Sequence, residues 1–132
     1  MYSIQVEHTF SAAHALTIAA VREPLHGHNW RVIVTLEGPI LDNDGLLCDF
    51  HTVHEHLVEV VARFDNNNFN EVTPFADKEP RHLNPSAELI ARHIADELQV
   101  RIGASLAPHA RIATVSVSEA HACVATYSPN RT

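Results

Sequence analysis

The chain has few cysteines, few basic residues and no long apolar run, and each shortage argues against a class of protein. Cys48 and Cys123 stand far apart among apolar neighbours, so we expect two buried thiols and no disulfide. Nine lysines and arginines against 16 acidic residues give a formal net charge of −7. A nucleic-acid partner is therefore not expected, because such proteins need a basic face. No stretch approaches the ~20 apolar residues of a membrane span, so no membrane partner is expected either.

Length and N-terminal composition predict one cytoplasmic domain. The first ten residues contain neither the basic nor the apolar region of a secretory signal. With 132 residues, of which 45% are hydrophobic, the chain can bury a single core. We therefore expect one domain over residues 1–132.

Hydrophobic spacing predicts four strands and two helices. Alternation and composition indicate strands over residues 2–10, 30–37, 110–120 and 123–128. Apolar residues at helical spacing indicate a helix over 50–63, and Asn84-Pro85-Ser86 followed by Glu88 is typical of the start of a second helix. The long Asn- and Pro-rich connection between them suits a functional loop or a disordered one. This order predicts an α+β domain in which an antiparallel sheet carries both helices on one face.

Three of the 11 histidines flank expected strands: His14 follows the first strand, and His26 and His28 precede the second. His26 and His28 are two residues apart, so both side chains face the same way, and Gly27 between them lets the backbone approach a ligand. If the first two strands pair, His14 arrives opposite these histidines. Three neutral imidazoles with an open fourth position are typical of a catalytic zinc site. The alternative is a polar surface turn with one histidine at the edge of the core.

The histidines within the expected helices need no special explanation. They stand on polar helix faces, and we expect all of them to be solvated: His51, His54, His56 and His93. No further cysteine or histidine stands at the close spacing of a zinc finger, which disfavours a purely structural zinc.

Six short motifs follow one another in the order of a known family. FSAAHAL resembles F-x-A-A-H-x-L, LHGHNW resembles L-H-G-H-N-Y, and GLLCDF resembles G-x-V-x-D-F. FDNNNFN resembles L-D-H-x-x-L-N, NPSAELIARHI resembles P-T-x-E-N-x-A-x-x-I, and VSVSEAHACVATY resembles V-x-V-x-E-T-x-x-x-x-A-x-Y. Together they resemble the 6-pyruvoyltetrahydropterin synthase family, which also contains 6-carboxytetrahydropterin synthase, over nearly the whole chain.

The resemblance implies a fold, an assembly and a set of site residues. The fold is a four-stranded antiparallel sheet with two helices on one side. Three subunits close their sheets into a barrel, and two such trimers usually stack into a hexamer. The active sites lie between subunits. His14, His26 and His28 match the zinc ligands. Glu119 matches the glutamate that anchors the pterin in the active site, and Glu88 is a second candidate contact, with helix-start electrostatics as its alternative role.

Two departures from the family pattern bear on catalysis. The family cysteine of C-x-x-x-H-G-H is replaced by Arg22, whereas Glu23 makes E-x-x-H-G-H. This resembles a branch of the family in which glutamate replaces the catalytic cysteine. Members of that branch cleave the side chain of dihydroneopterin triphosphate to leave 6-hydroxymethyl-dihydropterin. Asn66 stands where the family has a histidine, so of the usual proton-handling set only Asp65 remains, because an amide does not titrate near neutrality.

The sequence therefore predicts a zinc lyase that acts on the side chain of dihydroneopterin triphosphate or a related pterin. Glu23 is the candidate base, and Asp65 is the candidate that would replace it. Two alternatives stay open: a family member that binds pterin without turnover, and a 6-carboxytetrahydropterin synthase.

Overall fold

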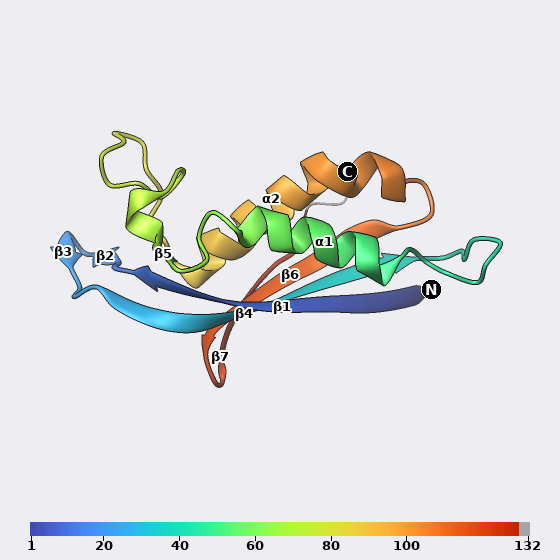
Figure 1. Cartoon of the computed structure of the whole chain (residues 1–132), viewed down its shortest axis with the longest axis horizontal. Helices are drawn as coiled ribbons and strands as arrows, with labels where there is room; N and C mark the ends of the chain where they lie inside the picture. The colour runs from blue at the N-terminus through green and yellow to red at the C-terminus, as the bar shows by residue number, and fades with distance from the viewer. Residues whose placement is uncertain (130–132) are drawn as a thin grey trace.

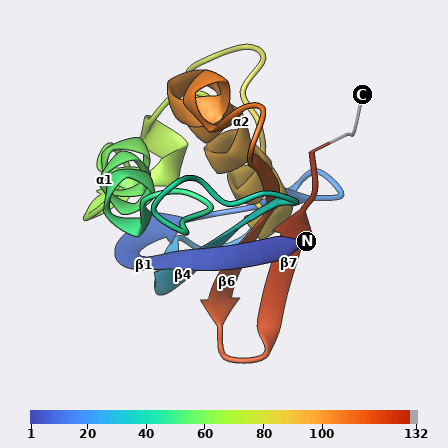
Figure 2. The ribbon, with the colours of Figure 1, turned by 90° about the vertical axis from the view of Figure 1, so that its right-hand side faces the viewer.

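The computed structural model describes residues 1–129, and it has the α+β architecture that the sequence predicts. Two helices lie along one face of a twisted sheet, and the other face is left open (Figures 1 and 2). The elements in chain order are β1 (Tyr2–His14), β2 (Thr17–Ile18), β3 (Val21–Arg22), β4 (His26–Gly38), α1 (Phe50–Val61), β5 (Asn67–Asn68), the 3₁₀-helix η1 (Phe69–Glu71), α2 (Ala87–Leu106), β6 (Arg111–Ala120) and β7 (Cys123–Tyr127).

The sheet has the order β5-β1-β4-β6-β7, and its four long strands are all antiparallel, as predicted. Beyond the prediction, the two-residue β5 pairs in parallel with the edge of β1, and β2 and β3 form a separate small ribbon. The first two expected strands were too short at one end. β1 continues to His14 and β4 already begins at His26, because the two segments pair through every residue between Tyr2–Gly38 and His14–His26.

The core lies between the sheet and the helices. The side chains of Trp30, Val32, Val34 and Leu36 alternate along β4 and are fully buried on the helix-facing side. Burying a large apolar side chain contributes about 1.5–3 kcal/mol each, so this face holds the helices on the sheet. Phe64, Phe69 and Phe75, from the segment between the helices, close the core near the site described below.

Both helices begin at a capping side chain. Asp49 accepts a hydrogen bond from the backbone N–H of His51 at the start of α1, and Ser86 accepts one from Leu89 at the start of α2. The second helix thus begins where the Asn-Pro-Ser signal predicted it. No helix in residues 1–129 is long and apolar enough to cross a membrane.

Two expectations about exposure are wrong. His93 is only partly exposed: its ring packs edge-on against Phe64 and Phe75, with centroid distances of 5.7 and 5.8 Å, because position 93 borders the buried stripe of α2. Neither cysteine is buried as expected: Cys123 is exposed, because it opens the edge strand β7, and Cys48 is only partly buried. Both cysteines are free thiols, as expected.

The remaining helical histidines lie mostly as expected. His51 and His54 are exposed on α1. His56 is only partly exposed, and its Nδ1 atom is buried.

His93 predicts a pH dependence of stability. Burial lowers its pKa below the usual 6.5, and Arg63 lies within 3.4 Å of its Nε2 atom. The folded state therefore binds fewer protons than the unfolded state, so this contribution is full above about pH 6.5 and is lost as the pH falls toward the folded-state pKa. Urea unfolding from pH 7.5 to 5.0 should show a falling free energy of unfolding, with a smaller slope in His93→Gln. The exposed His51→Gln variant is the control, and an unchanged slope in His93→Gln would contradict the assignment.

Candidate metal centre and adjoining grooves

The three histidines singled out in the sequence lie together at one end of the sheet. The register of β1 and β4 places His14 opposite His26, and Ala12 opposite His28. All three side chains therefore point to the helix-facing side of the sheet, since residues at even spacing along paired strands share a face. One ring nitrogen of each lies within 4.8 Å of the others.

Hydrogen bonds fix which ring nitrogens face the centre. Nδ1 of His14 lies 2.8 Å from the carbonyl oxygen of Pro85, and Nδ1 of His26 lies 2.8 Å from that of Pro24. A carbonyl only accepts, so each Nδ1 donates and each neutral ring keeps an unprotonated Nε2. These two Nε2 atoms are 3.1 Å apart. Such carbonyl partners commonly orient metal-ligating histidines.

Burial favours the neutral form of His14, which is the form that a metal requires. The side chain of His14 is 1% exposed and rests edge-on against Trp30, whose ring is fully buried. Burial lowers the pKa of His14, although the hydrogen bond to Pro85 opposes this. Nε2 of His28 is buried and has no hydrogen-bond partner among the described residues.

The donor set fits a cation. Oε2 of Glu119 lies 3.6 Å from Nε2 of His14 and 3.8 Å from Nε2 of His28. Two facing lone pairs, an orphaned third nitrogen and a carboxylate repel one another unless a positive charge lies between them. Three imidazoles and one further position suit a tetrahedral Zn²⁺.

Glu23 reaches the same centre from the segment that precedes β4. Its Oε1 atom accepts a hydrogen bond of 2.9 Å from the backbone N–H of Leu16 and lies 3.9 Å from Nε2 of His26. Its side chain is 30% exposed. The structure thus brings this candidate base to the histidines.

Glu119 and Glu88 line one groove beside the centre. Its volume is about 370 Å³, and it lies between the start of α2 and the strands β6 and β7. The groove is lined by the small side chains of Ala87 and Ala125, and Cys123 lines it as well. Glu88 is exposed in the first turn of α2, which also suits the alternative role that the sequence gave it.

Asp65 and Asn66 bind the edge of β1 instead of the histidines. Oδ1 of Asp65 accepts from the backbone N–H of Ser11, and the backbone N–H of Asn66 donates to the carbonyl of Ser11. Asn66 has a positive φ of 61°, which asparagine tolerates better than most residues. The structure therefore gives Asp65 a structural partner three residues before His14.

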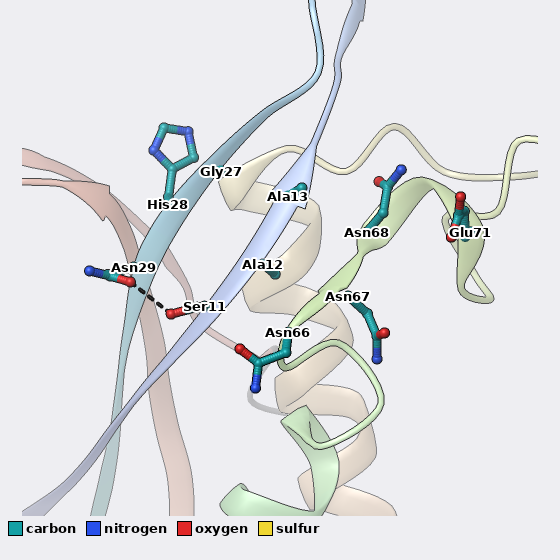
Figure 3. Close-up of a pocket in the computed structure, with 10 residues that line it drawn as sticks. All are labelled: Ser11, Ala12, Ala13, Gly27, His28, Asn29, Asn66, Asn67, Asn68 and Glu71. Carbon is teal, nitrogen blue, oxygen red and sulfur yellow. Dashed lines mark hydrogen bonds between the residues drawn. The ribbon is translucent and has the colours of Figure 1, made fainter.

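A second hollow, of about 620 Å³, lies where β1, β4 and β5 meet. Figure 3 shows its polar lining: Ser11 donates to Asn29 across the two long strands, and Asn66, Asn67 and Asn68 follow the edge. The ring of His28 leaves β4 in a different direction from the Asn29 side chain (Figure 3). His28, one histidine of the centre, and Asn66 thus line the same hollow.

Some residues of the site gave no signal in the sequence. The carbonyl of Pro85 and the ring of Trp30 support the histidines, yet backbone carbonyls and core aromatics carry no motif. Cys123 lines the groove although it is far from H-G-H in sequence. The position of Cys123 close to Glu119 in the sequence could have indicated this, because the two residues flank the tight turn between β6 and β7.

Comparison with known proteins assigns the family. Residues 3–130 match the sequence profile of 6-pyruvoyl tetrahydropterin synthase. The chain belongs to this family.

Among curated relatives, a 6-carboxy-5,6,7,8-tetrahydropterin synthase of Bacillus subtilis is 32% identical over 91 residues, 67% of this chain and 60% of that one. A dihydroneopterin monophosphate aldolase of Pyrococcus furiosus is also 32% identical over 91 residues, 69% of each chain. The chain spans only 58% and 60% of the length of two of the curated relatives it matches.

Solved structures show the same fold. The 6-pyruvoyl tetrahydropterin synthase of Caenorhabditis elegans superposes with a TM-score of 0.81 at 19% identity, over 98% of this chain and 96% of that chain. The enzyme of Plasmodium vivax gives 0.77 at 24% identity, over 98% of both chains. Another structure of the Plasmodium vivax protein is of a variant in which a catalytic glutamate is replaced by alanine.

The centre should bind one Zn²⁺ per chain with an affinity that falls as the pH drops, because imidazole ligands must be deprotonated. His26→Ala removes one ligand and should lower zinc content well below one equivalent after dialysis. His51→Ala, an exposed histidine on α1, should keep the full equivalent. Metal analysis of the purified variants measures this, and undiminished zinc in His26→Ala would refute the ligand set.

Proposed function

We propose that the protein is a zinc-dependent lyase that cleaves the side chain of dihydroneopterin triphosphate or a close pterin to leave 6-hydroxymethyl-dihydropterin. One observation carries the proposal: two carboxylates, Glu23 and Glu119, approach a cluster of three histidine nitrogens from different segments. Metal ligands, a candidate base and a candidate substrate anchor are the parts that such a reaction needs.

His14, His26 and His28 would hold the zinc through their Nε2 atoms. The ring orientation of His14 and His26 is set by the protein, because backbone carbonyls bind their opposite nitrogens. When bound, the metal would polarise side-chain oxygens of the substrate and stabilise negative charge that develops on them.

Glu119 is the proposed anchor for the pterin ring. A carboxylate accepts two parallel hydrogen bonds from the 2-amino group and the adjacent ring N–H, which resemble one edge of a guanidinium. The groove of about 370 Å³ beside Glu119 offers a place for a flat ring between small side chains. Glu88 would contact the substrate from the same groove.

Glu23 is the proposed base. It takes the proton of the side-chain hydroxyl, the electrons of that O–H bond form a carbonyl, and the adjacent carbon–carbon bond breaks. The carbon left on the pterin receives a proton, which the carboxylic acid of Glu23 can return. The aldolase relative supports carbon–carbon cleavage as the reaction type.

A thiol-dependent reaction of the 6-carboxytetrahydropterin synthase kind is the second candidate. The observation in its favour is that Cys123 lines the groove of Glu119 and Glu88. In that case Cys123→Ser would abolish turnover and Glu23→Gln would not. Identifying the pterin formed from dihydroneopterin triphosphate separates the two reactions, and a pterin binder without turnover would form none.

We also propose that the chain assembles as a trimer or a hexamer of stacked trimers. Within residues 1–129 the outer edge of β7 and most of the outer edge of β1 have no partner strand. Unpaired edges promote association, and closing three sheets into a barrel would remove them. Asp65 and Asn66 lie along the β1 edge, so a neighbouring β7 would bring its Glu119 groove toward them.

Glu23→Gln should keep zinc and pterin affinity but lose about 10²–10⁴ in rate, since removing a working base affects the transition state alone. Glu119→Gln should weaken pterin binding first. Steady-state kinetics and equilibrium binding of a pterin measure the two effects. Glu55→Gln, an exposed glutamate on α1, is the matched control. If Glu23→Gln turns over at the parental rate, Asp65 becomes the candidate base.

The assembly is testable at the β7 edge. Val124 is 63% exposed there, and Val100 is 84% exposed on α2. Val124→Asp should lower the mass measured by sedimentation equilibrium, because a charge would be buried between subunits. Val100→Asp should leave the mass of the trimer or hexamer unchanged. A parent protein that sediments as a monomer at micromolar concentration would rule the assembly out.

A further inference from the structure

The backbone just after His14 is bound by side chains from the segment between the two helices. Asn70, which is 4% exposed, accepts from the N–H of Ala15 at 2.8 Å and donates to its carbonyl at 3.0 Å. Asn84 accepts from the N–H of Thr17 at 3.0 Å and donates to its carbonyl at 3.1 Å. Each amide side chain thus replaces a neighbouring strand for one residue of the chain.

Glu23 binds Leu16, the residue between Ala15 and Thr17. Its Oε1 atom accepts from the N–H of Leu16, and its own N–H donates to the carbonyl of Leu16, both at 2.9 Å. The carboxylate that lies 3.9 Å from His26 is therefore fixed through the backbone of Leu16. One of its oxygens, Oε1, is engaged in this way, and no residue in 1–129 forms a hydrogen bond with Oε2.

Arg22, next to Glu23 in the chain, ties the same segment to the connection between the helices. Its Nη1 and Nη2 atoms donate to Oδ1 and Oδ2 of Asp77 at 3.0 and 2.8 Å, which is the two-pronged geometry that guanidinium and carboxylate prefer. Asn70 also donates to Oδ1 of Asp77 at 3.3 Å. One connected set of hydrogen bonds thus runs from Asp77 through Asn70 to Ala15.

The ion pair is placed to set geometry and contributes little to stability. The side chains of Arg22 and Asp77 are 45% and 43% exposed, and exposed pairs add little to folding free energy. A bidentate contact nevertheless fixes orientation, and small displacements of a catalytic group reduce rates steeply. Arg22 stands where the family pattern has its cysteine, and here that position serves as an anchor.

We propose that the Arg22–Asp77 ion pair, held by Asn70, positions the carboxylate of Glu23 at the histidine centre. Arg22, Asn70 and Asp77 are positioning residues, and none of them touches the reacting atoms. The inference rests on the proposed function, in which Glu23 is the base.

The test compares zinc-loaded parent protein with Asp77→Asn, Arg22→Gln and the double variant. Each single variant should lower kcat roughly tenfold, with KM, zinc content and Tm nearly unchanged, since a misplaced base affects the transition state more than binding. The double variant should be no slower than either single variant, because both remove the same interaction. Asp96→Asn and Arg92→Gln are the matched controls, drawn from an exposed ion pair on α2.

Amide hydrogen exchange supplies a readout that does not depend on turnover. Exchange in residues 15–23 should increase in Asp77→Asn and Arg22→Gln and stay at the parental level in the α2 controls. Unchanged exchange, parental kcat in the variants or additive effects in the double variant would each overturn the positioning role. An inactive parent would overturn the proposed function and the catalytic part of this inference, while the exchange data would still show whether the pair holds the segment.

Discussion

The pairing of β1 with β4 is the constraint on which the site depends. Because side chains alternate along a strand, a slip of one residue would turn His14 away from His26 and His28 and expose the apolar face of β4 to solvent. The register is held by the core side of the same strands, where Phe10 faces Trp30. Packing of the core and convergence of the ligands are therefore one requirement.

The histidine centre combines features that are unfavourable on their own. Electron-rich atoms face one another, one of them on a side chain that is almost completely buried. The Trp30 ring packs against His14 and His28, and the carbonyls of Pro85 and Pro24 hold the rings of His14 and His26 in orientation. Folding free energy from the surrounding core maintains this arrangement, as is common at functional sites.

The sequence predicted the parts of the fold that depend on periodicity. Apolar alternation in β4 and helical spacing in α1 report burial directly, so their faces could be assigned. The sequence analysis underestimated the length of β1 and β4 where histidines replace apolar residues on the inner face. Apolar alternation ceases there, while backbone pairing continues. The two-residue strands β2, β3 and β5 were not predicted, because they exist only through contacts with distant segments.

For the site, spacing predicted the three histidines and the family resemblance added Glu119 and Glu23. The structure brings all five together. What sequence reasoning could not predict is what Asp65 binds and how Leu16 fixes Glu23, because both interactions join a side chain to the backbone of another segment. Such contacts depend on chain geometry and leave no residue pattern.

The hydrogen bond from His14 to the carbonyl of Pro85 has a thermodynamic consequence. Pro85 lies two residues before α2, whose first turn carries Glu88 and borders the groove. A cation on His14 would strengthen this hydrogen bond, because coordination makes the ring N–H a better donor. By linkage, a molecule in the groove that strengthened the same hydrogen bond would raise the affinity for the cation. The cation would raise the affinity for that molecule by an equal factor. The carbonyl of Pro85 therefore links the orientation of His14 to the helix start that borders the groove.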